Sequence, residues 1–543
     1  MKRHEIFFLA AVYLLGLYLR LFPRLEIDPH LLTFQGDIWY RLCMAQSILD
    51  NHVLPEPDIR YLAYGYVPMW YPPLSPMLFA LGSFVSGLDV ATFSSRIVPF
   101  FEAATPLSIY FLARYLYNGK AAIIATLALA MTPSFVFWSG ISDPQSFTLF
   151  VLPLLVLFWI WHSGQDAKNK NMRLLAMGMI LAVNFLMHLS YFLEVLILFA
   201  VTLALIINRE AKKGLIVDFF KVVLISQAIT AFWWLPNGLY FWWINALVTS
   251  SGMYEASKHL SEYGIFAGIL GVFSFLYISH GYFFRRRLRH LILILWALPI
   301  FLETQNESII WMLGKINTDW YNTLVWSTVG KPLEGFRFYC FLAQPLSLAI
   351  GVFAAELSEV AGRYRRNLGI FVIILFIFGF AWGLSDYRYD VKFQTSGITP
   401  QEYEAAQWFR ENSKKTDRII ADYYRAQMFC AVSGGKALLG GMFPLRNVDY
   451  PYIKAPGEVQ NDLYKLYKAD GPKEASMLAK RYGATHIFYS DNMKRYGNLL
   501  SYQKPASQYG VDIDEKKFSS EEFFEFVYRE QSPYGEVVIV QVK

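Results

Sequence analysis

The sequence predicts a polytopic α-helical membrane protein with a soluble α/β domain at its C-terminal end. Three observations predict this class. Of the 543 residues, 55% are hydrophobic, 17% are aromatic and only 17% are charged, which is an unusual balance for a soluble protein. Apolar stretches that approach the length of a membrane span recur along residues 1–387. Residues 388–543 instead mix charged positions with short apolar runs.

About eleven membrane spans are predicted in residues 1–387, by the criterion of roughly twenty apolar residues for each span. They begin near residues 5, 95, 120, 144, 173, 191, 215, 264, 289, 338 and 368. Basic clusters, such as Lys2 with Arg3 and the run at 285–289, fall on every second connection. Because basic loops tend to stay in the cytoplasm, we expect a cytoplasmic N-terminus and, after an odd number of spans, a C-terminal domain outside. No small-residue cleavage site follows the first span, which predicts a retained anchor.

Two predicted external segments are too long to be simple turns. The first is the loop at about residues 25–94, and the second is the domain at 388–543. In that domain "PQEYEAAQWFRENS" has helical periodicity, and "RIIADYY", "THIFYSD" and "EVVIVQVK" are typical of strands. The sequence therefore predicts a small α/β domain on the outer face.

The three cysteines predict neither a disulfide framework nor a zinc site. Cys43, Cys340 and Cys430 lie far apart and lack paired spacing with each other or with histidine. We expect them to be packing residues. The net charge of +6 is modest, and no nucleic-acid partner is expected.

Two acidic residues stand where predicted external segments meet spans. Asp37 follows the first span in "GDIWYRL", and Asp143 precedes an apolar run in "SGISDPQSFTLF". Ionised carboxylates are costly near hydrocarbon, so each needs a partner or a task. Both lie on the same predicted side, where they could bind Mg²⁺ or Mn²⁺ through oxygen ligands. The alternative is that each acid caps a helix, and the sequence Asp143-Pro144 suits a helix start.

Three segments resemble the catalytic subunit of oligosaccharyltransferase of the archaeal and bacterial type. "SGISDPQSFTLFVLPLLVLF" is similar to its second acidic motif, and "GDIWYRLCMAQSILDN" with the later "YPPLSPML" is similar to its first-loop motif. "WFRENSKKTDRIIADYYR" followed by "LAKRYGATHIFYSD" resembles the start of its soluble domain. The resemblance implies an enzyme of the GT-C glycosyltransferase fold. Its donor would be a sugar on polyprenyl or dolichyl phosphate or diphosphate, and its acceptor a protein or glycan at the membrane lipid surface.

The resemblance also implies roles for individual residues. Asp37 and Asp143 would be the metal-facing catalytic acids, and Gln145 would be a further metal ligand. Glu262, in "HLSE", would orient the acceptor or support the metal, and Arg337, in "EGFRFYCFLAQP", would meet the donor phosphate. The short tail and the absence of long inserted loops are similar to prokaryotic members of the family, which implies a prokaryotic cell membrane.

Structural alternatives stand beside the last two assignments. Glu262 could be a solvated acid at a helix start. Arg337 could extend its side chain toward the membrane surface or pair with Glu334. The sequence alone leaves both readings open.

The chain departs from the family pattern at two places. Gln145 stands where the family has a second acid or a histidine, so a cation would be held more weakly. The WWDYG signature, which recognises the acceptor hydroxyl, should fall at residues 421–425, where the chain reads "ADYYR". Asp422, Tyr423 and Tyr424 retain an acid and two aromatics and are the candidate acceptor-binding residues. The alternative is that "ADYYR" is an ordinary strand end.

Other functions stay open at this point. A related enzyme could transfer the sugar to a glycan, a lipid or a different protein motif. A transporter of lipid-linked sugars would carry polar residues at several mid-span positions and internal repeats, which are not evident here. A non-catalytic relative is compatible with Gln145. The sequence contains no Gly-rich phosphate-binding loop, which argues against direct use of a nucleotide sugar.

Overall fold

The computed structural model describes most of the chain, in segments separated by short and long gaps. The described residues are 3–27, 36–54, 71–140, 142, 144–165, 168–208, 214–242, 265–285, 287–304, 338–364, 366–393, 398–434, 437–439, 456–468, 471–496 and 513–543. They form two compact units, which are described separately. Unit 1 comprises residues 1–23, 98–236 and 249–393, and unit 2 comprises residues 24–97, 237–248 and 394–543.

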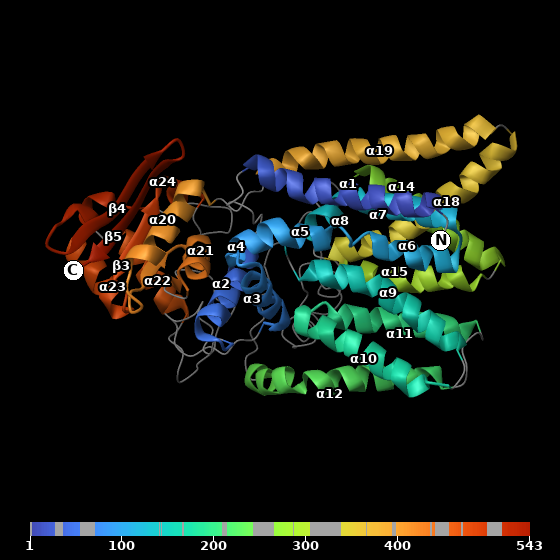
Figure 1. Ribbon diagram of the computed structural model, residues 1–543, viewed down its shortest axis with the longest axis horizontal. Helices are drawn as coiled ribbons and strands as arrows, with labels where there is room; N and C mark the ends of the chain where they lie inside the picture. The colour runs from blue at the N-terminus through green and yellow to red at the C-terminus, as the bar shows by residue number, and fades with distance from the viewer. Residues whose placement is uncertain are drawn as a thin grey trace, which may run out of the picture. The chain divides into compact units, whose positions relative to one another are not determined.

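Unit 1 is built from α-helices (Figure 1). Its described helices are α1 (Arg3–Ile27), α5 (Val98–Glu102), α6 (Leu107–Leu116), α7 (Gly119–Ala130), α8 (Pro133–Trp138), α9 (Gln145–Gly164), α10 (Lys170–Met187), α11 (Tyr191–Ile207), α12 (Leu215–Trp242), α14 (Ile265–Arg285), α15 (Leu288–Thr304), α18 (Tyr339–Tyr364) and α19 (Arg366–Phe393). A helix therefore stands at each position where the sequence predicts a span.

Helix α18 is the central element of this bundle and packs against α7, α14, α15 and α19. Its approach to α7 depends on Gly351, because a Cβ atom there would lie 2.5 Å from the carbonyl oxygen of Ala121. Small residues at such a crossing let two helix backbones pack closely. Any larger side chain at position 351 would force α18 away from α7.

Several helices of the bundle have the length and composition of membrane spans. Among the described residues, five pass such a test, namely Gln145–Gly164, Lys170–Met187, Leu215–Pro236, Phe266–Phe284 and Tyr339–Arg363. The helix pair Leu74–Ser86 and Val90–Leu116, bent by 105°, would be a sixth if it forms one span. The predicted total of about eleven spans stays a prediction.

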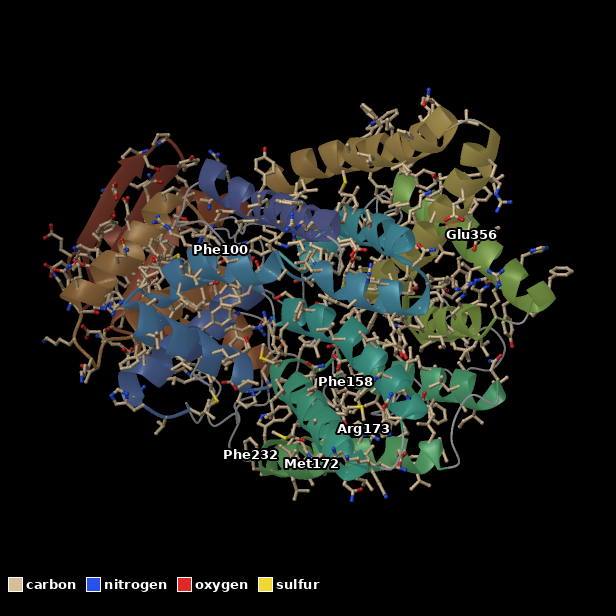
Figure 2. All side chains as sticks on the ribbon, turned by 45° about the vertical axis from the view of Figure 1, so that its right-hand side comes forward. Phe100, Phe158, Met172, Arg173, Phe232 and Glu356 are labelled. Atoms are coloured by element: carbon tan, nitrogen blue, oxygen red, sulfur yellow. A yellow bond between two sulfur atoms is a disulfide. The ribbon has the colours of Figure 1, made fainter. Side chains whose placement is uncertain are left out.

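The outward side chains of these helices are largely apolar. Phe158, Met172 and Phe232, labelled in Figure 2, are 41%, 67% and 66% exposed, respectively. Large apolar side chains that are exposed over several adjacent helices are typical of a surface in contact with lipid rather than water. The composition of the sequence and the surface of the bundle thus agree.

Unit 2 combines residues of the first loop with the C-terminal residues. From the first loop come α2 (Gly36–Asn51), α3 (Leu74–Ser86), α4 (Val90–Thr92) and the π-helix η2 (Phe93–Ile97). The C-terminal elements are α20 (Pro400–Asn412), β1 (Ile419–Ala421), α21 (Tyr423–Ser433), β2 (Ala437–Leu439), α22 (Pro456–Lys468), α23 (Pro472–Arg481), β3 (His486–Ser490), α24 (Asp491–Tyr496), the 3₁₀ helix η4 (Glu515–Ser519), β4 (Phe524–Ser532) and β5 (Gly535–Val542).

The strands of unit 2 form one mixed sheet in the order β2-β1-β3-β5-β4. Strand β1 is parallel to β2 and β3, whereas β5 is antiparallel to β3 and β4. The three segments that the sequence indicates as strands are β1, β3 and β5. Their central residues are buried because helices pack on this sheet, as in other α/β layers.

Helix α20 forms where the sequence has helical periodicity. Thr399 and Glu402 make a capping box at its start, and Pro400 occupies the first turn. These side chains satisfy backbone N–H groups that would otherwise lack partners at a helix start. The helix ends at Asn412, close to the end of the apolar pattern.

A disulfide joins the first loop to the C-terminal region inside unit 2. Cys43 of α2 is bonded to Cys430 of α21, with their Cα atoms 5.1 Å apart and 387 positions separating them in the sequence. The prediction that both are simple packing residues was wrong, because sequence spacing does not show that α2 packs on α21. Cys340 is a free, buried thiol.

Removal of this disulfide should destabilise unit 2. For Cys43→Ser with Cys430→Ser we expect a loss of about 2–5 kcal/mol, because the bond constrains an unfolded chain over a long loop. Thermal unfolding of the full-length protein in detergent, with and without reductant, would measure this loss. Cys340→Ala is the control and should keep the reductant-sensitive shift. An unfolding temperature of the wild type that is the same with and without reductant would contradict the prediction.

Candidate functional site

The predicted site residues fall into three groups: those outside the described residues, those described by their backbone only, and those described with their side chains. Three lie outside the described residues: Asp143, Glu262 and Arg337. Three are placed by their backbone at helix starts, Asp37 as the second residue of α2 and Tyr423 with Tyr424 as the first two of α21. Two are placed with their side chains, Gln145 and Asp422.

The segment before α9, residues 139–144, is held at its first residue by Arg20 of α1. The Arg20 Nε donates to the carbonyl oxygen of Ser139 at 3.3 Å, and a terminal nitrogen of the guanidinium donates to the Ser139 hydroxyl. The other terminal nitrogen donates to the Gly16 carbonyl oxygen at 3.0 Å. Arg20 is 2% exposed, so these bonds replace the water that the buried guanidinium has lost.

A second buried charge holds the same segment next to Asp143. The Glu102 side chain, 2% exposed, accepts a hydrogen bond from the backbone N–H of Ser142 at 2.6 Å. Ser142 has φ of +55°, in the left-handed region that few residues other than glycine adopt. The chain therefore turns sharply immediately before Asp143, and a carboxylate holds the turn.

Gln145 begins α9 and faces the interior of unit 1. It is 3% exposed, and its Nε2 donates to Cys340 Sγ at 3.0 Å. The N-cap position of α9 is occupied by Pro144 and has no side-chain cap. The helix boundary thus places Asp143 one residue before the cap. A metal-ligating role for Gln145 stays a prediction.

Among the described residues, no group of three or more His, Cys, Asp and Glu side chains is placed to hold a metal ion. The predicted acids, Asp37 and Asp143, belong to different units, and Asp143 lies outside the described residues. The Mg²⁺ or Mn²⁺ site therefore stays a prediction.

In unit 2, Asp422 is part of a buried ion network rather than an open surface. As the N-cap of α21, its carboxylate accepts from the Arg425 backbone N–H at 3.3 Å and pairs with Arg425 Nη1 at 3.1 Å. Arg425 Nε in turn donates to Glu402 Oε1 at 2.6 Å. All three side chains are 0% exposed. The "ADYYR" segment is thus the end of β1 followed by a helix start, which agrees with the alternative of a strand end.

The network has further donors that complete its hydrogen bonding. Ser490 donates to Glu402 Oε1, and Asn492 Nδ2 donates to Glu402 Oε2 at 3.1 Å. Burial alone would lower the pKa of Arg425, but the charges of Asp422 and Glu402 outweigh it and leave that pKa raised. The guanidinium therefore stays charged and pairs both acids.

Sequence reasoning missed Glu102, Arg20 and Arg425. For Glu102 a signal was present, because "VPFFEAATPLSIYF" places one acid inside a long apolar run. The same criterion drew attention to Asp143. Arg425 gave no such signal, since its two partners are 3 and 23 positions away in a polar segment.

The fold is that of the GT-C membrane glycosyltransferases, as the resemblance to oligosaccharyltransferase implied. The apo oligosaccharyltransferase of Archaeoglobus fulgidus superposes with a TM-score of 0.64 at 13% identity, over 98% of this chain and 80% of that chain. The archaeal oligosaccharyltransferase AglB from Archaeoglobus fulgidus, in complex with an inhibitory peptide and a dolichol-phosphate, gives a TM-score of 0.61 at 13% identity, with the same coverage.

A bacterial enzyme shares the fold over nearly its full length. ArnT from Cupriavidus metallidurans, bound to undecaprenyl phosphate, superposes with a TM-score of 0.61 at 12% identity, over 100% of this chain and 99% of that chain. Residues 71–236 match the family model described as dolichyl-phosphate-mannose-protein mannosyltransferase. A search of curated proteins finds no match to the sequence. At these identities the likeness concerns the fold.

Proposed function

We propose that this protein is a membrane glycosyltransferase that moves a sugar or oligosaccharide from a polyprenyl- or dolichyl-phosphate-linked donor to an acceptor on the outer face. The observation that carries the proposal is the fold, which is shared along nearly the whole chain with two proteins solved with polyprenyl phosphates bound. The Cys43–Cys430 bond supports the outer location of unit 2, because disulfides persist in oxidising compartments.

The roles proposed for the site residues follow from the charges that such a reaction develops. Cleavage of the sugar–phosphate bond leaves negative charge on the lipid phosphate. Asp37 and Asp143 would hold a Mg²⁺ or Mn²⁺ ion, which when bound supplies a Lewis acid for that charge. Arg337 would donate charge-assisted hydrogen bonds to the same phosphate. Glu262 would accept a hydrogen bond or proton from the attacking group.

The acceptor is proposed to differ from the Asn-x-Ser/Thr sequon. The paired tryptophans and the glycine of the WWDYG signature are absent, and Asp422 is 0% exposed and paired with Arg425. A fully buried, ion-paired carboxylate is poorly placed to meet a peptide hydroxyl. We therefore favour a glycan or lipid acceptor and keep a protein acceptor as the second candidate.

A transfer assay tests the proposal. Full-length protein in native lipid extract with Mn²⁺ would be offered a labelled Asn-x-Thr peptide, and mass spectrometry would examine the peptide, glycan and lipid fractions. A glycosylated lipid or glycan beside unmodified peptide is the expected result. Modified peptide would identify an oligosaccharyltransferase that works without the signature. Donor that stays intact in all fractions would contradict enzymatic function, and its movement across a vesicle membrane would indicate a transporter.

A further inference from the structure

Glu102 is a buried acid whose position needs an explanation. It is the last residue of α5, inside the apolar region that leads into α6. Phe100, two residues earlier on α5 and labelled in Figure 2, is 44% exposed, whereas Glu102 is 2% exposed. In a water-soluble protein, the carboxylate would be expected at the surface and the aromatic ring in the interior, whereas here the carboxylate is buried and the ring is exposed. In a membrane protein, inward ionisable groups commonly have a functional task.

We propose that Glu102 is a positioning residue of the active site, which sets the place of Asp143 by holding the backbone of Ser142. The inference rests on the proposed function, because that function gives Asp143 its catalytic role. Glu102 itself is not proposed to touch donor, acceptor or metal.

The first support is the geometry of the contact. The Ser142 N–H donates to Glu102 Oε1 at 2.6 Å, a short hydrogen bond in which the carboxylate oxygen is the acceptor. The backbone of Glu102 is anchored in turn, since its carbonyl oxygen accepts from the Thr105 N–H at 3.1 Å and from the Thr105 hydroxyl at 2.7 Å. The backbone that carries this carboxylate therefore belongs to a hydrogen-bonded turn.

The second support is the conformation of the residue that Glu102 holds. Ser142 adopts φ of +55°, a conformation that costs a non-glycine residue about 1–3 kcal/mol and persists only where the surroundings impose it. The backbone bends at this residue. Because Ser142 directly precedes Asp143, the turn decides where the next residue begins.

The third support is that both flanks of Asp143 are tied to separate helices. Before it, Arg20 of α1 holds Ser139 and Glu102 of α5 holds Ser142. After it, Gln145 donates to Cys340 of α18 at 3.0 Å. A segment held from three helices is preorganised, and catalysis is sensitive to displacements of about 1 Å, which can cost about 100-fold in rate.

Three substitutions distinguish the effect of the position of the acceptor oxygen from the effect of the negative charge. Glu102→Gln keeps an oxygen acceptor at the same distance from the backbone and removes the charge. Glu102→Asp keeps the charge and withdraws the acceptor by one methylene. Glu102→Leu removes the acceptor. Thr126→Val is the matched control, because its buried hydroxyl bonds only to the Ala122 carbonyl oxygen of its own helix among the contacts described.

The test measures two properties of full-length protein in lipid nanodiscs. Hydrogen exchange of peptides that cover residues 137–149 reports whether Ser142 is held. Steady-state transfer with varied lipid-linked donor separates kcat from KM. We expect Glu102→Leu to speed exchange about tenfold or more and lower kcat about 100-fold with KM little changed. Glu102→Gln should stay within about threefold of wild type, Glu102→Asp should fall between them, and Thr126→Val should match wild type.

The outcomes that overturn the inference are distinct from failure of the proposed function. Unchanged exchange in Glu102→Leu would show that Glu102 does not hold the segment. Greater loss of activity in Glu102→Gln than in Glu102→Asp would show that activity depends on the negative charge and not on the distance that the side chain spans to the Ser142 N–H. If Glu102→Leu does not fold, the order of the Gln and Asp variants still decides. A wild type that transfers no sugar would reject the proposed function, and the exchange measurement would still test the contact.

Discussion

Asp143→Ala and Asp37→Ala should each lower sugar transfer by at least about 1,000-fold, as expected when a member of a catalytic set is removed. In the proposed reaction these two carboxylates hold the cation that accepts charge from the leaving phosphate, and neither can replace the other. Both variants should remain folded, because Asp37 is only the second residue of α2 and position 143 precedes the first residue of α9, Gln145. Initial rates of transfer from lipid-linked donor, at saturating Mn²⁺, would measure the loss.

A control on the same helix separates loss of catalysis from loss of structure. Asp50 lies near the C-terminal end of α2, is exposed, and accepts a hydrogen bond from Gln46 at 2.9 Å. Asp50→Ala should keep transfer within about threefold of wild type, as is usual for exposed residues outside the catalytic set. If both Asp37→Ala and Asp143→Ala retain activity, the metal hypothesis fails. Manganese binding by the wild type, measured without substrate, tests the same hypothesis independently of turnover.

Arg425→Leu should lower the free energy of unfolding of unit 2 by about 3–5 kcal/mol, the range for removing one partner of a buried ion network. The variant leaves Asp422 and Glu402 fully buried without the guanidinium that pairs both. Denaturant unfolding of the full-length protein, followed by hydrogen exchange in β1 and β3, would measure the change. Arg481→Leu is the control, because Arg481 and its partner Glu458 are 50% and 51% exposed, and the more buried partner, Asp462, keeps a hydrogen bond from the Tyr482 hydroxyl at 2.8 Å. It should cost at most about 1 kcal/mol.

The same variant should respond to pH in a definite direction. Without Arg425, Asp422 and Glu402 would be buried as two nearby anions, which protonation relieves. The stability deficit of Arg425→Leu relative to wild type should therefore be largest above neutral pH and shrink as pH falls and the carboxyls bind protons. Addition of Asp422→Asn and Glu402→Gln should recover part of the loss at neutral pH. An equal deficit at all pH values would indicate that lost packing, not unpaired charge, is the cause.

Local pattern in the sequence predicted most of the elements. Apolar runs marked the long helices of unit 1, but not the short α5 and α8 as separate helices, and short apolar runs marked β1, β3 and β5. The capping residues of α20, Thr399 and Glu402, are readable in the sequence because a capping box spans only four positions. Hydrophobic period and caps act over one or two turns, so a single sequence contains the information for them. The fold of the membrane glycosyltransferases was likewise predicted from short motifs in the right order.

Only the tertiary structure decided which distant residues meet. Cys43 bonds to Cys430, Arg425 joins Glu402 to Asp422, and Glu102 holds Ser142. Each pairing depends on how separate helices and strands pack, and packing is selected by burial of many side chains together, which no local pattern specifies. This is why Asp422, a predicted acceptor-binding residue, is a buried helix cap in the structure. It is also why an acid in α5, which matches no motif, is the residue that anchors the chain beside Asp143.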